Sequence, residues 1–421
     1  MDTFELSAHF FLQLAVILLA CRLAGWVARL IHQPQVIGEM IAGVALGPSI
    51  FGLWLPEAQA WLFPEPSKPI LFAVSQVGLA LYMFLVGVEF QGDLLRQSGR
   101  SALAVSVAGM AAPFVAGVAI AAWLVREPGM FGPQVHLFEA TLFLGASMAI
   151  TAFPMLARII YERGLTGTAL GTLTLAAGAI DDAAAWCVLA IVLASLDHSW
   201  PVAAKAIGGG VAYAVVVLSV GRRLLRPLGA RAERAGSIPQ PVLVLTLALL
   251  MLGAWCTDIL GIYAVFGAFV LGVAMPRGFF AETLRRMLGP LTVALLLPLF
   301  FTFSGLNTRL DLLADPRSWL IALVVLLAAC LAKGGACWWA ARCLGEEQRT
   351  ALAVGALMNA RGLMELIILN IGLQRGIISH ALFSIFVVMA IATTLLATPV
   401  FEWVYGSRAR ATGELGPERR D

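Results

Sequence analysis

The feature that most constrains the fold of this chain is a series of long apolar segments that recurs along its whole length. Hydrophobic residues make up 60% of the chain and charged residues 13%, against about a quarter charged in soluble domains. Each segment is close to the roughly 20 residues that cross a bilayer as a helix. We predict an all-α polytopic membrane protein with about thirteen transmembrane helices, near residues 6–30, 35–53, 70–90, 102–125, 135–160, 170–196, 202–225, 239–256, 260–275, 291–305, 319–344, 351–373 and 381–405.

The distribution of basic residues predicts the orientation of these helices. With thirteen crossings, alternate loops on one side collect most of the arginines, including the cluster at 222–234. Basic loops face the cytoplasm, which places the N-terminus outside and the C-terminus inside. Joining segments 239–256 and 260–275 into one helix would move the C-terminus to the other side. The other set of loops holds only Lys68, Arg126, Lys205, Arg309, Arg317 and Arg375.

Two adjacent aspartates, Asp181 and Asp182, lie inside the apolar segment 170–196. A charged carboxylate near the middle of a membrane costs at least about 2.5 kcal/mol, and such residues are typical of ion or proton pathways. Neighbours on a helix point about 100° apart, so the pair can serve two partners. The alternative is a pair buried for packing and neutralised by protonation or by one basic residue. We favour the ion pathway.

Two segments carry residues that interrupt helices. The first holds Phe153 and Pro154, and proline inside a helix frees backbone carbonyls. The second holds Asn359, Arg361 and Gly362 in mid-segment. Freed carbonyls at membrane depth occur only where protein, water or an ion satisfies them. One interrupted helix in each half of the chain is typical of transporters built from inverted repeats, with crossing helix breaks at the substrate site.

Two basic residues lie at membrane depth and require acidic partners. Lys333 is near the middle of segment 319–344, too far from its ends to reach the interface,. Asp181 or Asp182 is the expected partner, and the adjacent Gly334 and Gly335 would allow another helix to approach closely. Arg361 has Glu365 four residues further on, at the spacing of helix neighbours. We interpret that pair as mainly structural.

Several motifs together resemble the cation:proton antiporter-2 family of the sodium/proton exchanger superfamily, which includes NapA-like and KefC-like membrane domains. The resemblance covers essentially the whole chain. The motifs are HQPQVIGEMIAGVALGPS (32–49), MFLVGVEF (83–90), TAFPMLARIIYERG (151–164), AIDDAAAW (179–186), CLAKGG (330–335) and NARGLMEL (359–366).

The resemblance implies a NhaA/NapA-like fold, a homodimer, and a core domain that moves against a scaffold. Residues 1–405 would form the transmembrane antiporter domain, with scaffold and dimer helices at about 6–90 and 239–305. Core helices would lie at about 102–196 and 319–405, and 406–421 would be a cytoplasmic tail whose charged composition predicts disorder. Asp182 matches the carboxylate that binds the ion, Asp181 its neighbour, and Lys333 the lysine paired with Asp181. Thr151 and Ala152 match positions that hold the ion.

We therefore expect a secondary antiporter, and not an enzyme, that exchanges Na⁺ or K⁺ for H⁺ by alternating access. The Asp–Asp–Lys pattern favours electrogenic exchange. The alternative is electroneutral K⁺ exchange of the KefC or plant and fungal type, and a sodium-coupled organic anion symporter is a further rival. An intramembrane aspartyl protease would need a GxGD motif, which is absent. We expect a bacterial inner-membrane location, no cofactor and no nucleic-acid partner.

Overall fold

The computed structural model describes residues 3–31, 33–89, 99–151, 153–163, 165, 168–196, 200–261, 264–313 and 315–406. For some residues inside these ranges, Asp182 among them, only the backbone is described. Each of the thirteen predicted segments contains helix among its described residues, and the described residues contain no β-strand. The predicted all-α membrane fold is therefore confirmed. The predicted tail lies outside the described residues from 407 onward.

Nine helical stretches among the described residues are long and apolar enough to cross a membrane. Four more apolar helices are shorter, at Leu137–Ala149, Ala169–Gly178, Ala264–Ala274 and Glu365–Gln374. The first and last of these are halves of the two segments predicted to be interrupted. The helix α13 (Gln240–Ile259) ends before Gly261, whose φ of 86° reverses the chain, and α14 (Ala264–Ala274) then packs against α13. The two segments near 260 are thus separate helices.

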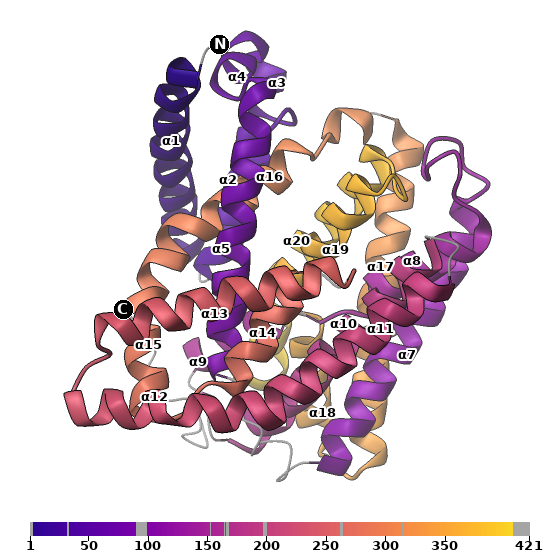
Figure 1. Ribbon diagram of the computed structural model, residues 1–421. Helices are drawn as coiled ribbons and strands as arrows, with labels where there is room; N and C mark the ends of the chain where they lie inside the picture. The colour runs from indigo at the N-terminus through magenta and orange to yellow at the C-terminus, as the bar shows by residue number, and fades with distance from the viewer. Residues whose placement is uncertain are drawn as a thin grey trace. The chain divides into compact units, whose positions relative to one another are not determined.

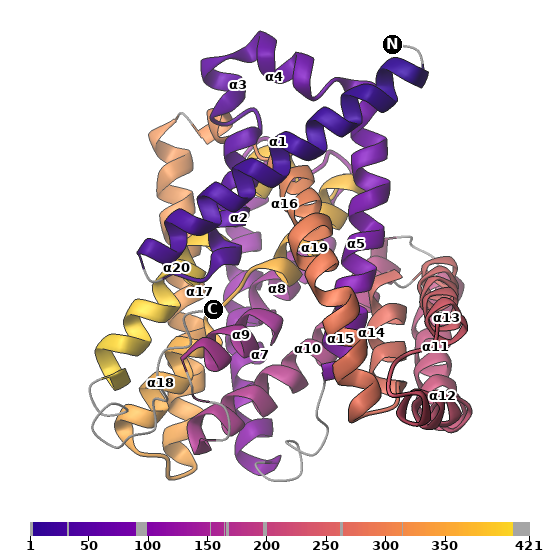
Figure 2. The same cartoon turned by 90° about the vertical axis from the view of Figure 1, so that its left-hand side faces the viewer.

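The chain divides into two compact units by its internal contacts. The first comprises residues 1–22, 55–90 and 193–303. Within it α5 and α14 lie side by side (Figure 2), and the apolar core includes Phe84, Leu250 and Phe280. Its helices, with the first part of α1 (Thr3–Leu30), are α4 (Pro56–Leu62), α5 (Lys68–Glu89), α11 (Trp200–Val216), α12 (Arg222–Ala235), α13, α14, α15 (Phe279–Leu291) and most of α16 (Leu297–Leu306).

The second unit comprises residues 23–54, 91–192 and 304–421. Helix α17 packs against α7, α18 and α20 there (Figure 1). The same order of elements occurs twice along this unit: a long helix, an interrupted helix, and a second long helix. The helices are α2 (Gln35–Leu46), α3 (Phe51–Trp54), α7 (Gly99–Leu124), α8 (Leu137–Ala149), α9 (Phe153–Glu162), α10 (Ala169–Leu196), α17 (Pro316–Cys343), α18 (Gln348–Met358), α19 (Leu363–Gln374) and α20 (His380–Phe401).

Candidate ion-exchange site

The first interruption lies between α8 and α9. Helix α8 ends at Ala149, Ile150 and Thr151 are not helical, and α9 begins at Phe153. Phe153 and Pro154, which we predicted inside the break, therefore begin the second half-helix instead. Proline is favourable in the first turn of a helix because the N–H it lacks has no partner there. Ala152 lies outside the described residues.

The second interruption lies between α18 and α19. Helix α18 ends at Met358, residues 359–362 are not helical, and α19 begins at Leu363. Gly362 has φ 143° and ψ −120°, a conformation that residues with a side chain rarely adopt,. Asn359 donates from Nδ2 to the Cys330 and Gly355 carbonyls, both at 3.3 Å, and so ties the break to α17. The residues predicted to unwind this helix thus lie in the break.

The glycines beside Lys333 differ in their surroundings. A Cβ on Gly334 would collide with the amide nitrogen of Asn359, so only glycine permits this approach of α17 to α18. A Cβ on Gly335 would meet no atom of a neighbouring helix within 4 Å. The expectation of close helix approach therefore holds for Gly334 and is wrong for Gly335, because successive helical positions face different directions.

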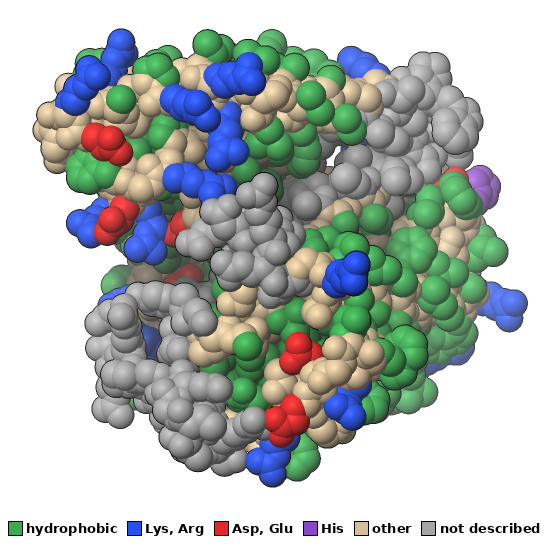
Figure 3. Space-filling model, turned by 90° about the horizontal axis from the view of Figure 1, so that it is seen from below, with side chains coloured by type: hydrophobic (Ala, Val, Ile, Leu, Met, Phe, Trp, Pro, Cys, Tyr) green, Lys and Arg blue, Asp and Glu red, His purple; other side chains and the backbone are tan. Residues whose placement is uncertain are grey.

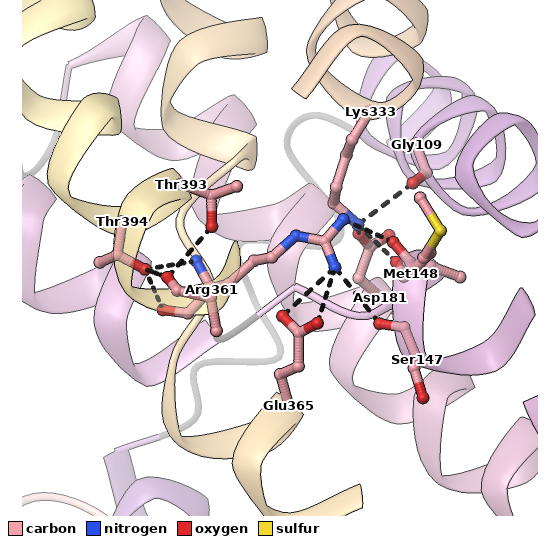
Figure 4. Close-up of polar contacts among 11 residues, drawn as sticks. Gly109, Ser147, Met148, Asp181, Lys333, Arg361, Glu365, Thr393 and Thr394 are labelled. Carbon is pink, nitrogen blue, oxygen red and sulfur yellow. Dashed lines mark hydrogen bonds and ion pairs between the residues drawn. The ribbon is translucent and has the colours of Figure 1, made fainter. Parts of the chain in front are cut away.

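The end of α8 presents carbonyls to two buried cations (Figure 4). The last carbonyls of a helix have no donor within it and carry the negative end of its dipole. Arg361 donates from Nη1 to the Ser147 carbonyl at 3.3 Å and from Nη2 to the Met148 carbonyl at 2.7 Å. Lys333 donates from Nζ to the Ala149 carbonyl at 2.5 Å. The free carbonyls at the end of α8 therefore accept hydrogen bonds from side chains of α17 and of the second break.

Asp181 is completely buried and accepts hydrogen bonds from three other segments. Ser106 on α7 donates to Oδ1 at 2.6 Å, and Thr151 in the first break donates to Oδ2 at 2.6 Å. Lys333 Nζ lies 3.4 Å from Oδ2, and its side chain is also completely buried. Of the two aspartates proposed as partners of Lys333, the structure places Asp181 beside it. Asp182 follows in α10, and its side chain lies outside the described part of the structure.

Arg361 and Glu365 form a second buried pair in the second break. Arg361 Nη1 lies 3.3 Å from both carboxylate oxygens of Glu365, and the two side chains are 0% and 1% exposed. Glu365 is in the first turn of α19, where the helix dipole favours a negative charge,. The Arg361 N–H donates to the Thr394 hydroxyl of α20 at 3.2 Å, and that hydroxyl lies 3.0 Å from the Arg361 carbonyl. Because Arg361 also donates to carbonyls at the end of α8, the predicted pair takes part in capping that helix.

Sequence reasoning missed Ser106, Thr394 and the carbonyl acceptors of α8. Ser106 is a polar residue in an otherwise apolar helix, which is a weak signal because a serine hydroxyl can bond to its own helix backbone. Thr394 gives the same weak signal in α20. The carbonyls carry no residue-type signal, since any residue at the end of α8 would supply them.

Two repeated sets of helices, each with an interrupted member, meet at buried charged pairs. This architecture is that of a class of secondary transporter. A protein-family model described as the transmembrane sodium/hydrogen exchanger matches residues 15–405. The chain belongs to this family. The predicted resemblance is confirmed, as is cation/proton exchange as the general activity.

The relatives include proteins named as Na⁺/H⁺ antiporters and proteins named as K⁺/H⁺ antiporters. The chain is 38% identical over 400 residues to the Na⁺/H⁺ antiporter NhaS4 of Synechocystis sp., covering 94% of this chain and 96% of that protein. It is 34% identical to Cation/H⁺ antiporter 18 of Arabidopsis thaliana over 96% of this chain and 50% of the plant protein. It is 32% identical to K⁺/H⁺ antiporter 1 of Saccharomyces cerevisiae, over 94% of this chain and 46% of that protein. The chain thus spans about half the length of the plant and yeast relatives.

Among solved structures, the sodium/proton antiporter MjNhaP1 of Methanocaldococcus jannaschii matches with a TM-score of 0.66. The match covers 97% of this chain and all of that chain at 14% identity. This likeness is one of fold, and it agrees with the predicted antiporter architecture.

Proposed function

We propose that this protein exchanges Na⁺ or K⁺ for H⁺ at the Asp181–Asp182 pair, electrogenically, by alternating access. The observation that carries the proposal is the buried contact of Asp181 with Lys333 beside the end of an interrupted helix. Asp182, the adjacent carboxylate on the same helix, is assigned to bind the cation and the proton in turn. Thr151 and the backbone at Ala152 are assigned to complete the ion's coordination.

The pairing supports electrogenic exchange. A cation that binds at the two carboxylates competes with the Lys333 ammonium for Asp181. When the pair breaks, Lys333 and Asp182 together account for more than one proton per cation. If the pair stays intact, only Asp182 exchanges, one proton for one cation. That second case corresponds to the alternative of electroneutral K⁺/H⁺ exchange; among the relatives, the yeast protein is named a K⁺/H⁺ antiporter.

The arginines of α12 support the proposed orientation. Helix α12 joins directly to the apolar stretch that begins at Gly208. Lys and Arg side chains gather on the face seen in Figure 3, and on α12 Arg222, Arg223, Arg226, Arg231 and Arg234 are all exposed. Basic residues next to a span remain in the cytoplasm. We infer an outside N-terminus and a cytoplasmic C-terminus, in a bacterial inner membrane, and from the family resemblance a homodimer.

Proton flux in liposomes tests the proposed function. Purified protein is reconstituted into vesicles that hold a pH gradient, and Na⁺, K⁺, Li⁺ or Rb⁺ is added in separate runs. We expect Na⁺ or K⁺ to dissipate the gradient at low concentration, because a desolvated carboxylate site binds cations and protons competitively. Vesicles without protein and a choline salt are the controls. Dissipation by no monovalent cation, from a folded preparation, would refute exchange.

A further inference from the structure

Pro113 lies inside α7, one turn beyond Gly109, and it is buried. In a continuous helix the N–H of residue 113 would donate to the carbonyl of residue 109. Proline has no N–H, and its ring pushes that carbonyl away from the helix axis. Lys333 Nζ donates to the Gly109 carbonyl at 3.1 Å. The acceptor that Pro113 withdraws from α7 is therefore used by the buried lysine of the ion site.

Each N–H of the Lys333 ammonium has an acceptor, and two of the three acceptors are carbonyls freed from helix hydrogen bonding. An ammonium has three N–H donors, and here they face the Gly109 carbonyl, the Ala149 carbonyl and Asp181 Oδ2. The first carbonyl is released by a proline and the second by the end of α8. The contact with Asp181 is the longest of the three, at 3.4 Å. Two neutral acceptors thus hold the lysine whether or not it contacts Asp181.

We propose that Pro113 is a positioning residue for exchange, which keeps a backbone acceptor ready for Lys333 when a cation takes its place at Asp181. This inference rests on the proposed function. With Pro113 present, the displaced ammonium keeps two carbonyl acceptors. With a residue that has an N–H at 113, the helix shares the Gly109 carbonyl with Lys333 and weakens it as an acceptor, so the ammonium depends more heavily on Asp181. The cation must then compete against a stronger Lys333–Asp181 contact.

The same device occurs elsewhere in this unit and supplies a matched control. Pro399 lies inside α20, and the carbonyl four residues before it, that of Leu395, accepts from Gln33 Nε2 at 3.4 Å. A side chain again satisfies the carbonyl that a helix proline releases, here with the proline itself exposed. Among the hydrogen bonds of the described residues, none joins Gln33 or Leu395 to Asp181 or Lys333. Pro399→Ala therefore makes the same chemical change away from the site.

The test compares Pro113→Ala with Pro399→Ala in proteoliposomes, measuring KM for the cation separately from the maximal rate. We expect Pro113→Ala to raise KM about tenfold, the order of an equilibrium change from one hydrogen bond to a charged group. The maximal rate should change much less, and Pro399→Ala should leave KM at the wild-type value. An unchanged KM for Pro113→Ala in an exchanging protein would overturn the proposal.

Thermal unfolding in detergent tests whether Pro113 acts through Lys333. Pro113→Ala is made in the wild type and in Lys333→Met, where nothing competes for the Gly109 carbonyl. We expect it to raise Tm more in Lys333→Met than in the wild type; equal changes would overturn the proposal. Failure to fold in both backgrounds, while Pro399→Ala folds, would also overturn it. A wild type that exchanges no cation refutes the proposed function instead, and the Tm comparison still tests the link to Lys333.

Discussion

Asp182→Asn is expected to abolish cation-dependent proton flux while leaving a folded protein. The amide has nearly the shape of the carboxylate, but it carries no charge to balance a cation and takes up no proton at physiological pH. The measurement is pH-gradient dissipation in proteoliposomes at saturating cation. Tm and the size-exclusion profile in detergent report whether the variant is folded.

The matched control for Asp182→Asn is Asp258→Asn. Asp258 is an exposed carboxylate near the end of α13, so the same chemical change there should leave the flux near that of the wild type. Flux at ordinary rates in Asp182→Asn would show that Asp182 is not the shared binding site. Asp181, whose oxygens already accept from Ser106, Thr151 and Lys333, would then be the remaining candidate in this pair.

Breaking the Lys333–Asp181 pair from one side is expected to lower stability strongly. Removing one partner of a buried ion pair leaves an uncompensated charge and costs about 3–5 kcal/mol in the soluble proteins where this has been measured. Lys333→Met leaves Asp181 with two hydroxyl donors, and Asp181→Asn leaves Lys333 with two carbonyl acceptors. Each variant should therefore unfold at a lower temperature in detergent than the wild type.

The double variant decides whether the two residues act as a pair. With both charges removed, neither is left unpaired, so Lys333→Met with Asp181→Asn should recover part of the lost stability. Arg285→Met, which breaks the contact of Arg285 with Glu89, two side chains that are 55% and 52% exposed, is the control for a pair in solvent and should cost about 1 kcal/mol or less. Losses in the double variant equal to the sum of the single losses would mean that the contact contributes nothing.

The fold followed from the sequence because apolar length and helix-breaking residues are local signals. Thirteen segments were visible as runs of apolar residues, and the two breaks were marked by Pro154 and Gly362. The first break lies just before the position predicted from Pro154, because proline can both end a helix and occupy its first turn,. Gly362 located the second break directly, since its positive φ belongs to the broken backbone itself.

The site followed only in part, because its contacts join residues far apart in the chain. An unpaired lysine at membrane depth predicted an acidic partner, but its position alone left Asp181 and Asp182 open, and only the family resemblance implied Asp181. That choice depends on how α10 is turned toward α17. Two other parts of the chain supply the donors and carbonyls of the site. Helix α7 supplies Ser106 and the Gly109 carbonyl, and the end of α8 with the break after it supplies the Ala149 carbonyl and Thr151. Arg361 was assigned to Glu365 by spacing alone, and its second role on the carbonyls of α8 depended on the packing of the two breaks.

The most direct measurement of the central claim is cation uptake driven by membrane potential alone. Proteoliposomes with equal pH on both sides are given a potential through an ionophore for an ion that the protein does not carry. If Lys333 leaves Asp181 during exchange, more than one proton moves per cation, and the potential should drive cation movement whose direction reverses with its sign. Vesicles without protein and vesicles with Asp182→Asn should show no response. Cation movement unaffected by potential, in a preparation that exchanges well under a pH gradient, would mean one-for-one exchange and a purely structural Lys333.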